Sequence, residues 1–144
     1  MCIVSVIMSV YNEPEDWLKS SVDSILTQSY ENFEFIIVND NPTSERLADL
    51  LENYKLKDAR ITLITNEENS GLTFSLNIGM QVAKGKYIAR MDADDISDPE
   101  RLAIQVRVLE KNNHIVACGT NYYKINHHGK RIETVNTSIS DLDI

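Results

Sequence analysis

Apolar runs alternate with helix-type patterns along most of this chain, and this alternation limits the possible folds more than any other feature. Residues 3–10 form a continuous apolar run, as expected for a strand that is covered on both faces. Strands are predicted at residues 3–10, 33–38, 61–65, 87–91, 115–118 and 122–125. Helical spacing of apolar residues fills the gaps between the first strands. Alternating strands and helices predict an α/β fold, with a Rossmann-like, mostly parallel sheet and helices on both faces.

The predicted helices have recognisable ends. The first covers residues 15–29, and Ser44 is well placed to cap the second. The third ends near Gly85, which we expect at the C′ position. Pro99 suits the first turn of the fourth helix, with Asp98 as its N-cap.

The C-terminal part has weaker signals. Residues 126–129 read as a turn, which fits a hairpin. Residues 133–144 contain few apolar anchors and stop without a closing element. We therefore expect residues 1–144 to form a single domain truncated at its C-terminal end; the alternative is a loose natural tail.

Composition excludes several classes of protein. The length of 144 residues and 42% hydrophobic content suit an ordinary globular domain, and the net charge of −8 argues against binding to nucleic acid. Cys2 and Cys118 have neither metal-site spacing nor a CxxC pattern, which favours a reducing compartment. The apolar start is too short for a membrane span, and no transmembrane segment is predicted.

Three carboxylates, Asp92, Asp94 and Asp95, directly follow the predicted strand at 87–91. Clustered like charges are unfavourable unless they are solvated or neutralised by a cation. Hard oxygen ligands suit Mg²⁺ or Mn²⁺, which usually bind through a few carboxylates plus substrate phosphates. The run therefore suggests a metal-assisted diphosphate site; the alternative is a solvated acidic turn.

Other polar residues are expected at the same sheet edge, because the carboxyl ends of parallel strands lie together. Alternatives remain open: Tyr11 as a rim aromatic, Asp40 as a turn former, and Asn69 and Gly71 as turn residues, with positive φ at Gly71. Asn77 is unfavourable inside a helix, which weakly favours a ligand or packing role. The residues expected at this edge are Tyr11, Asn12, Glu13, Asp40, 69–71 and 92–95.

Four ordered motifs resemble inverting GT-A glycosyltransferases of family 2. They lie at residues 4–13 (VSVIMSVYNE), 36–44 (IIVNDNPTS), 69–79 (NSGLTFSLNIG) and 85–102, which includes MDADD and PERL. The resemblance covers residues 3 to about 119. Asn39 departs from it, because the family usually has a first aspartate there.

The resemblance implies a nucleotide-diphospho-sugar donor, most often UDP-linked, and Mn²⁺ or Mg²⁺ as cofactor. By position, Tyr11, Glu13 and Asp40 would contact the base and ribose. Asp94 would hold the metal together with Asp92, which would also face the ribose or sugar. The other residues expected to bind the nucleotide are Asn69, Gly71, Asn77 and Ala93.

The resemblance also implies a glycan or lipid-linked acceptor, a role in bacterial surface polysaccharide synthesis, and a general base beyond Ile144. We expect this part alone to be inactive. The location implied is cytoplasmic, or peripheral at the inner face of the membrane for the full protein.

Rival functions fit less well. A sugar-1-phosphate nucleotidyltransferase needs a glycine-rich basic loop after the first strand, where this chain has the acidic residues 11–14. A receiver-like signalling module needs an aspartate after the third strand, where Thr65 and Asn66 stand. A non-catalytic nucleotide-binding module stays open.

Overall fold

The computed structural model describes residues 3–137. These fall into two compact units, which divide between Pro99 and Glu100. The elements of the first unit are β1 (Val4–Val10), α1 (Glu15–Leu26), β2 (Phe33–Asn39), α2 (Glu45–Lys57), β3 (Ile61–Thr65), α3 (Leu72–Val82) and β4 (Tyr87–Arg90). The second unit contains α4 (Arg101–Lys111), β5 (Tyr122–Ile125) and β6 (Arg131–Val135). The single-domain expectation stays a prediction.

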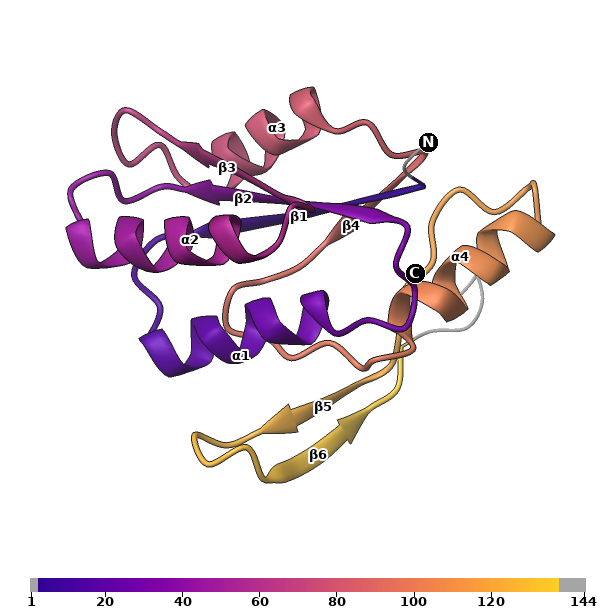
Figure 1. The fold of residues 1–144 in the computed structure, drawn as a ribbon. Coiled ribbons are helices and arrows are strands. Elements are labelled where there is room, and N and C mark those ends of the chain that lie inside the picture. Colours follow the sequence, from indigo (N-terminus) through magenta and orange to yellow (C-terminus); the bar gives the residue numbers. More distant parts are fainter. Residues whose placement is uncertain (1–2, 138–144) are drawn as a thin grey trace. The chain divides into compact units, whose positions relative to one another are not determined.

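The first unit confirms the predicted α/β class. Its sheet has the order β3-β2-β1-β4, and all three strand pairs are parallel. Helix α3 lies on one face of the sheet, and α1 and α2 lie on the other (Figure 1). Ile7, Ile36 and Val38 are buried on the α3 side, where Leu76 packs against them.

Short-range signals set most of the boundaries. The Ser44 hydroxyl accepts a hydrogen bond from the Leu47 N–H, so the predicted cap of α2 is confirmed. Helix α4 begins later than predicted, at Arg101 with Glu100 as its N-cap, so the assignment of Asp98 as the cap is wrong. The backbone of Asp98 is instead held by Gln28, two residues past the end of α1, whose side-chain amide donates to the Asp98 carbonyl.

Two glycines bring the connection around α3 close to β1. A Cβ at Gly79 would lie 2.5 Å from the Ile7 Cγ2, so the glycine permits a close approach of helix and sheet. Gly85 does not adopt the positive φ of a C′ glycine, so that prediction is wrong. Its role is also close approach, because a Cβ there would lie 2.5 Å from the backbone nitrogen of Ser5.

Gly85→Ala is expected to lower the free energy of unfolding by about 1–3 kcal/mol, because the new methyl would overlap backbone that cannot move aside. Urea denaturation would measure the change. Gly119→Ala is the matched control, since a Cβ at Gly119 meets no atom within 4 Å. Equal stability of the two variants would contradict the close-approach explanation.

The second unit differs from expectation in two places. Residues 115–118 are not a strand, and Val116 is 96% exposed. In the described part of this unit only β5 and β6 pair, so residues 115–118 have no neighbouring strand to bond. The hairpin at residues 126–129 is confirmed, and its second strand β6 includes residues predicted as loose tail. Residues 138–144 of that tail lie outside the described part.

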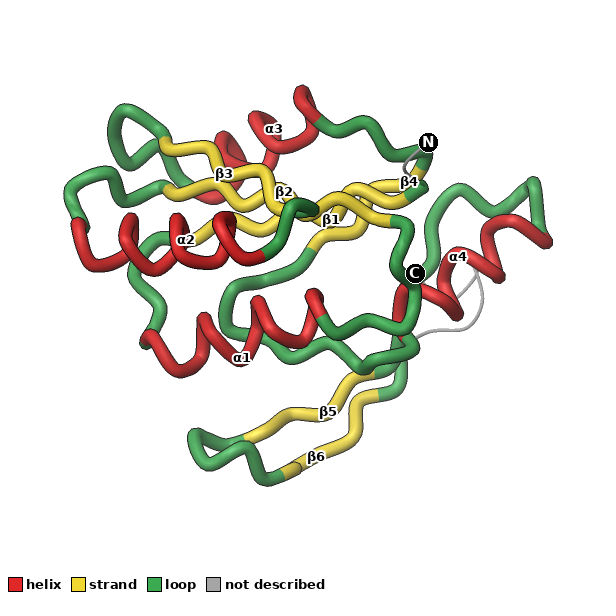
Figure 2. The backbone as a smooth tube through the Cα atoms, viewed as in Figure 1, coloured by secondary structure: helices red, strands yellow, loops and turns green. Residues whose placement is uncertain are grey.

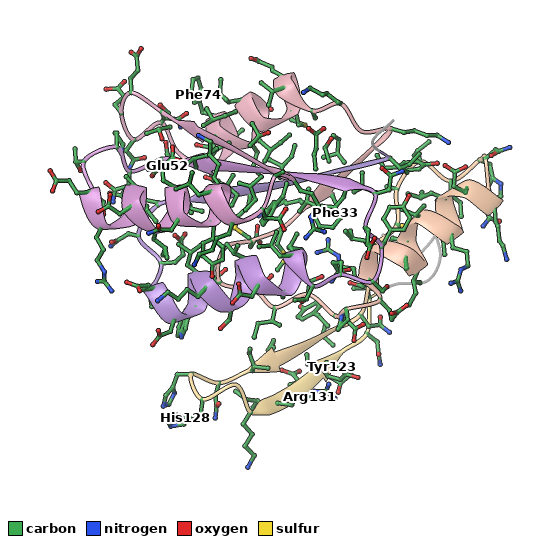
Figure 3. All side chains as sticks on the ribbon, in the orientation of Figure 1. Phe33, Glu52, Phe74, Tyr123, His128 and Arg131 are labelled. Carbon is green, nitrogen blue, oxygen red and sulfur yellow. The ribbon has the colours of Figure 1, made fainter. Side chains whose placement is uncertain are left out.

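The hairpin has polar and aromatic surface contacts. The Arg131 guanidinium lies 3.9 Å from the centre of the Tyr123 ring on the facing strand (Figure 3). His127 and His128 are exposed.

Candidate functional site

The carboxyl ends of β1, β2, β3 and β4 share one edge of the sheet, and the loops that follow them lie there (Figure 2). The chain passes from β1 to β2 and β3 on one side of β1, whereas β4 pairs on the other side. The strand order therefore reverses between β1 and β4. In open α/β sheets, ligands bind in the crevice outside such a switch point.

Asp40 is the best-connected carboxylate at this edge. It is 2% exposed, and its Oδ1 accepts hydrogen bonds from the Asn66 Nδ2 at 2.7 Å and the Ser70 N–H at 2.9 Å. Its Oδ2 accepts from the Gly71 N–H at 2.8 Å. Asp40 thereby joins the end of β2 to the loop between β3 and α3, and it is not an Asx-type turn former.

These donors outweigh the effect of burial on the Asp40 pKa. Burial alone raises the pKa, but hydrogen bonds from Ser70, Asn66, Gly71 and Ser75 hold it below the ordinary value of 3.8. The carboxylate is therefore ionised in the folded chain at neutral pH. Its base contact stays a prediction, because most of its acceptor positions are already used within the protein.

The low Asp40 pKa predicts a loss of stability in acid. A group whose folded pKa is depressed stabilises the fold above its unfolded pKa, and this contribution is lost as the pH falls from about 4 through the folded pKa. In Asp40→Asn, the free energy of unfolding should be lower at pH 7 and depend less on pH below 4. Urea titrations across pH would test this. Asp49→Asn, an exposed carboxylate on α2, is the control. Parallel pH curves for parent and Asp40→Asn would contradict the assignment.

Asn39, which replaces the usual first aspartate of the family, is fully buried. Its Oδ1 accepts from the Asn41 N–H at 2.9 Å, so Asn39 makes the Asx-type bond in this loop. Its Nδ2 has no hydrogen-bond partner among residues 3–137.

The loop after β1 presents Tyr11, whose side chain is 47% exposed at the edge. Its backbone is held on both sides: the N–H donates to the Glu13 Oε2 at 2.9 Å, and the carbonyl accepts from the Asn41 Nδ2 at 3.0 Å. Glu13 therefore shapes its own loop. The exposed phenol ring offers a flat face on which a base could stack.

The acidic residues after β4 have different surroundings. Asp92 forms a two-point ion pair with Arg90, at 2.9 and 3.1 Å. Ala93 is buried, whereas Asp94 is exposed. The Asp95 N–H donates to the Asp92 carbonyl at 3.3 Å, so Ala93 and Asp94 form the tip of a turn.

The donor set fits a substrate-assisted metal site. The described residues contain no group of three His, Cys, Asp or Glu side chains that would hold a metal alone. Mg²⁺ usually needs only one or two carboxylates plus phosphate oxygens. The exposed Asp94 can supply one carboxylate, and Asp92 a second if its pair with Arg90 opens.

The remaining predicted residues lie in or beyond the loop before α3. Gly71 has φ +87°, which confirms the predicted positive φ, and it is the N-cap of α3. Asn69 is exposed in this loop, and Asn77 is exposed on α3. Their nucleotide contacts stay predictions.

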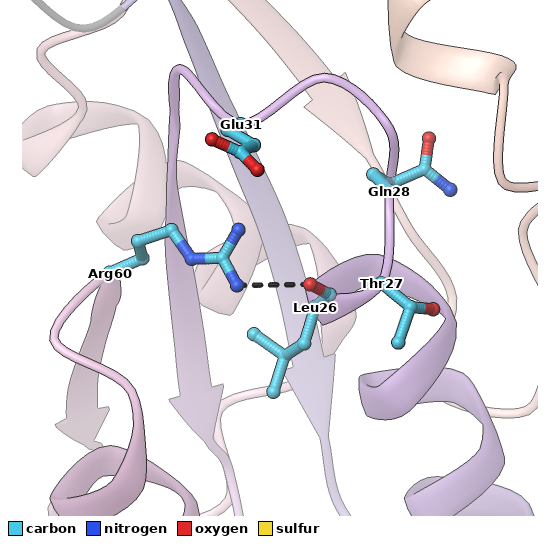
Figure 4. A pocket seen from close by; sticks show the side chains of 5 residues that line it. All are labelled: Leu26, Thr27, Gln28, Glu31 and Arg60. Carbon is cyan, nitrogen blue, oxygen red and sulfur yellow. Dashed lines mark hydrogen bonds between the residues drawn. The ribbon is translucent and has the colours of Figure 1, made fainter.

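A pocket elsewhere in the first unit is a structural feature. It measures about 500 Å³ and is lined by Leu26, Thr27, Gln28, Glu31 and Arg60, at the amino end of β2 and β3 (Figure 4). The Arg60 Nη2 donates to the Leu26 carbonyl at the end of α1, and Arg60 also pairs with Asp58. Arg60 therefore caps the C-terminal end of α1, and the Asp58 carboxylate balances its charge.

Several contributing residues were missed from the sequence. Asn66 is buried and donates to both Asp40 and the Ser75 hydroxyl. Ser21 is buried on α1 and donates to the Asp92 carbonyl at 2.9 Å. Ser21 gave a weak signal, because it is polar among the apolar residues Leu18, Val22 and Ile25 of α1. Asn66 gave none, because it lies in a polar turn.

Comparison with solved structures places this fold among the GT-A-fold glycosyltransferases. The structure of Staphylococcus aureus TarS 1–349 in complex with UDP-GlcNAc matches with a TM-score of 0.69 and 25% identity, over 77% of this chain and 32% of that one. The mannosyltransferase PcManGT of Pyrobaculum calidifontis, in complex with GDP-Man and Mn²⁺, matches with a TM-score of 0.66 and 24% identity, over 74% and 32%. The second likeness shows the fold alone.

The sequence comparison then gives the family. The model of glycosyl transferase family 2 matches residues 5–137, and the chain belongs to this family. An uncharacterized glycosyltransferase of Methanocaldococcus jannaschii is 44% identical over 88% of this chain and 44% of its own length. One from Haemophilus influenzae is 48% identical over 82% and 36%. The chain thus spans less than half the length of these relatives. No helix in the described part has the length and apolarity to cross a membrane.

Proposed function

We propose that this chain is the donor-binding part of an inverting glycosyltransferase and takes a nucleotide-diphospho-sugar. The observation that carries the proposal is the meeting of three loops at the switch point, in a chain of family 2. These are the Tyr11 loop, the loop held by Asp40, and the turn that carries Asp94. They bring a flat aromatic face and carboxylates to the same edge of the sheet.

Charge explains why a cation belongs in this proposal. The chain has a net charge of −8, and a diphosphate adds further negative charge beside Asp92 and Asp94. Mn²⁺ or Mg²⁺ bound there would neutralise the leaving diphosphate. Asp94 would hold the cation, with Asp92 beside it.

The chain's own residues would bind and orient the donor. Tyr11 would stack on the base, with Glu13 keeping its loop in shape. Asp40 would keep the loop at Ser70 and Gly71 in position, and Asn69, Asn77 and Ala93 would complete the nucleotide surface. The acceptor hydroxyl would be activated by a carboxylate base outside this chain, and inversion would follow from a single displacement.

The finer assignments are a UDP-sugar donor and a glycan or lipid-linked acceptor, within bacterial surface polysaccharide synthesis. TarS, whose structure contains UDP-GlcNAc, supports the choice of uridine. We further propose a cytoplasmic location, with peripheral attachment of the full protein to the inner face of the membrane.

Calorimetric titration with three nucleoside diphosphates tests the proposal. In the presence of Mn²⁺, UDP should bind the chain more tightly than CDP or ADP. Uracil presents an N3–H donor to an acidic edge, which cytosine and adenine lack. AMP without a diphosphate is the negative control. Equal affinity for all three diphosphates would contradict the choice of uridine, and the absence of any binding would contradict the donor-site proposal itself.

A further inference from the structure

The segment between β4 and α4 has no regular secondary structure between residues 92 and 98, yet it carries the proposed metal ligand. Backbone polar groups of such a segment need partners from elsewhere in the protein. Much of this bonding comes from α1 and from the residues directly after it. These hydrogen bonds limit where the carboxylates after β4 can lie.

Ser21 and Ser24 on α1, together with Gln28 two residues past its end at Leu26, form a polar row that we name the α1 ladder. The spacing of three residues puts the two serines on one face of the helix. The Ser21 hydroxyl donates to the Asp92 carbonyl at 2.9 Å, and the Ser24 hydroxyl accepts from the Ser97 N–H at 3.0 Å. Gln28 donates to the Ser97 hydroxyl at 3.2 Å and to the Asp98 carbonyl at 2.6 Å.

Burial makes these bonds consequential. Ser21 is 0% exposed, Gln28 4% and Ser97 6%. A buried polar group that loses its partner cannot turn to water instead. Next to Gln28 in the chain, the Ser29 N–H donates to the Pro99 carbonyl at 2.9 Å.

Asp94 lies between two anchored points of this segment. The Asp92 carbonyl that accepts from Ser21 also accepts from the Asp95 N–H, which closes the turn with Asp94 at its tip. The next anchor is Ser97, held by Ser24 and Gln28. The exposed Asp94 carboxylate is therefore carried on a short turn whose two ends are both bonded to α1.

We propose that the α1 ladder positions the Asp94 turn for the metal and diphosphate, with Ser21 and Ser24 as positioning residues. The expected effect on metal and diphosphate binding rests on the proposed function. The anchoring of the turn rests only on the hydrogen bonds described above. Outer contacts that orient a metal ligand typically change metal affinity by about 10–100-fold when removed.

The first test needs no ligand. Hydrogen exchange of the Ser97 and Asp95 amides is measured by NMR in the parent, Ser21→Ala, Ser24→Ala and Ser24→Thr. Ser24→Ala should speed exchange at Ser97, Ser21→Ala should speed it at Asp95, and Ser24→Thr should restore protection at Ser97 by keeping the hydroxyl. Unchanged exchange in both alanine variants would overturn the anchoring.

The second test compares UDP affinity with and without Mn²⁺. Mn²⁺ should increase UDP affinity about 10-fold less in Ser21→Ala and Ser24→Ala than in the parent. The UDP affinity without metal should change little. Ser20→Ala is the matched control, because the exposed Ser20 hydroxyl donates to the Asp16 carbonyl of its own helix. Ile25→Val, a buried change on α1, controls for lost stability.

The outcomes separate the two proposals. If Ile25→Val reduces the Mn²⁺-dependent gain in UDP affinity as much as the ladder variants do, the effect comes from lost stability. That result would overturn the positioning role. If the parent shows no Mn²⁺ gain, the proposed function fails and the ladder's role in binding falls with it, while the exchange result still decides the anchoring.

Discussion

The 144-residue chain is expected to bind donor and transfer no detectable sugar. The motifs assigned to base, ribose and diphosphate all precede residue 112. By residue type, the candidate bases after that point are His127, His128 and Asp141; the two histidines are exposed in the hairpin turn, and Asp141 lies outside the described residues. Absence of general acid–base help alone lowers rates by about 10²–10⁴-fold. Absence of acceptor positioning adds roughly 7 kcal/mol or more to the barrier.

Transfer is measured with labelled nucleotide-sugars, Mn²⁺ and a lysate that supplies acceptors. The comparison is a longer protein in which the residues after Ile144 are included. We expect transfer only from the longer protein, with donor binding by both. A similar rate from the 144-residue chain would place the catalytic base within it and refute the donor-part proposal.

Asp94→Ala is expected to remove the Mn²⁺-dependent part of UDP binding and leave the fold intact. Asp94 is exposed at the tip of its turn, so its loss opens no cavity. Removing an outer contact of a metal ligand already costs about 10–100-fold in affinity, so loss of the ligand itself should cost on the order of 100-fold or more.

Calorimetry with UDP and Mn²⁺ would measure this, with thermal unfolding to confirm the fold. Asp49→Ala removes the same charge from an exposed site on α2 and should bind as the parent does. If the folded Asp94→Ala variant keeps the parent affinity, Asp94 is not the metal ligand.

The order of elements in the first unit could be predicted because each leaves a strong local signal. Continuous apolar runs gave β1 and β2, and helical spacing together with Ser44 gave α2. The same reasoning failed at residues 115–118, where a short apolar run has no partner strand in the described part. Strand formation there depends on a neighbour, and sequence pattern alone does not reveal one.

The site was predictable to the level of the sheet edge. Parallel strands bring Tyr11, Asp40 and Asp94 to the same edge, which required no knowledge of side chains. The bonds that shape the edge could not be predicted in the same way. Asp40 is held by Asn66, 26 residues away, and Asp92 by Ser21, 71 residues away.

The position of the bound nucleotide tests the central claim most directly. NMR chemical-shift changes on titrating UDP with Mg²⁺ would locate it on the chain. We expect the largest changes in the loops after β1, β3 and β4, at Tyr11, Gly71 and residues 92–95. Changes concentrated instead around Arg60 and Gln28, at the pocket beside the amino end of β2, would contradict the account.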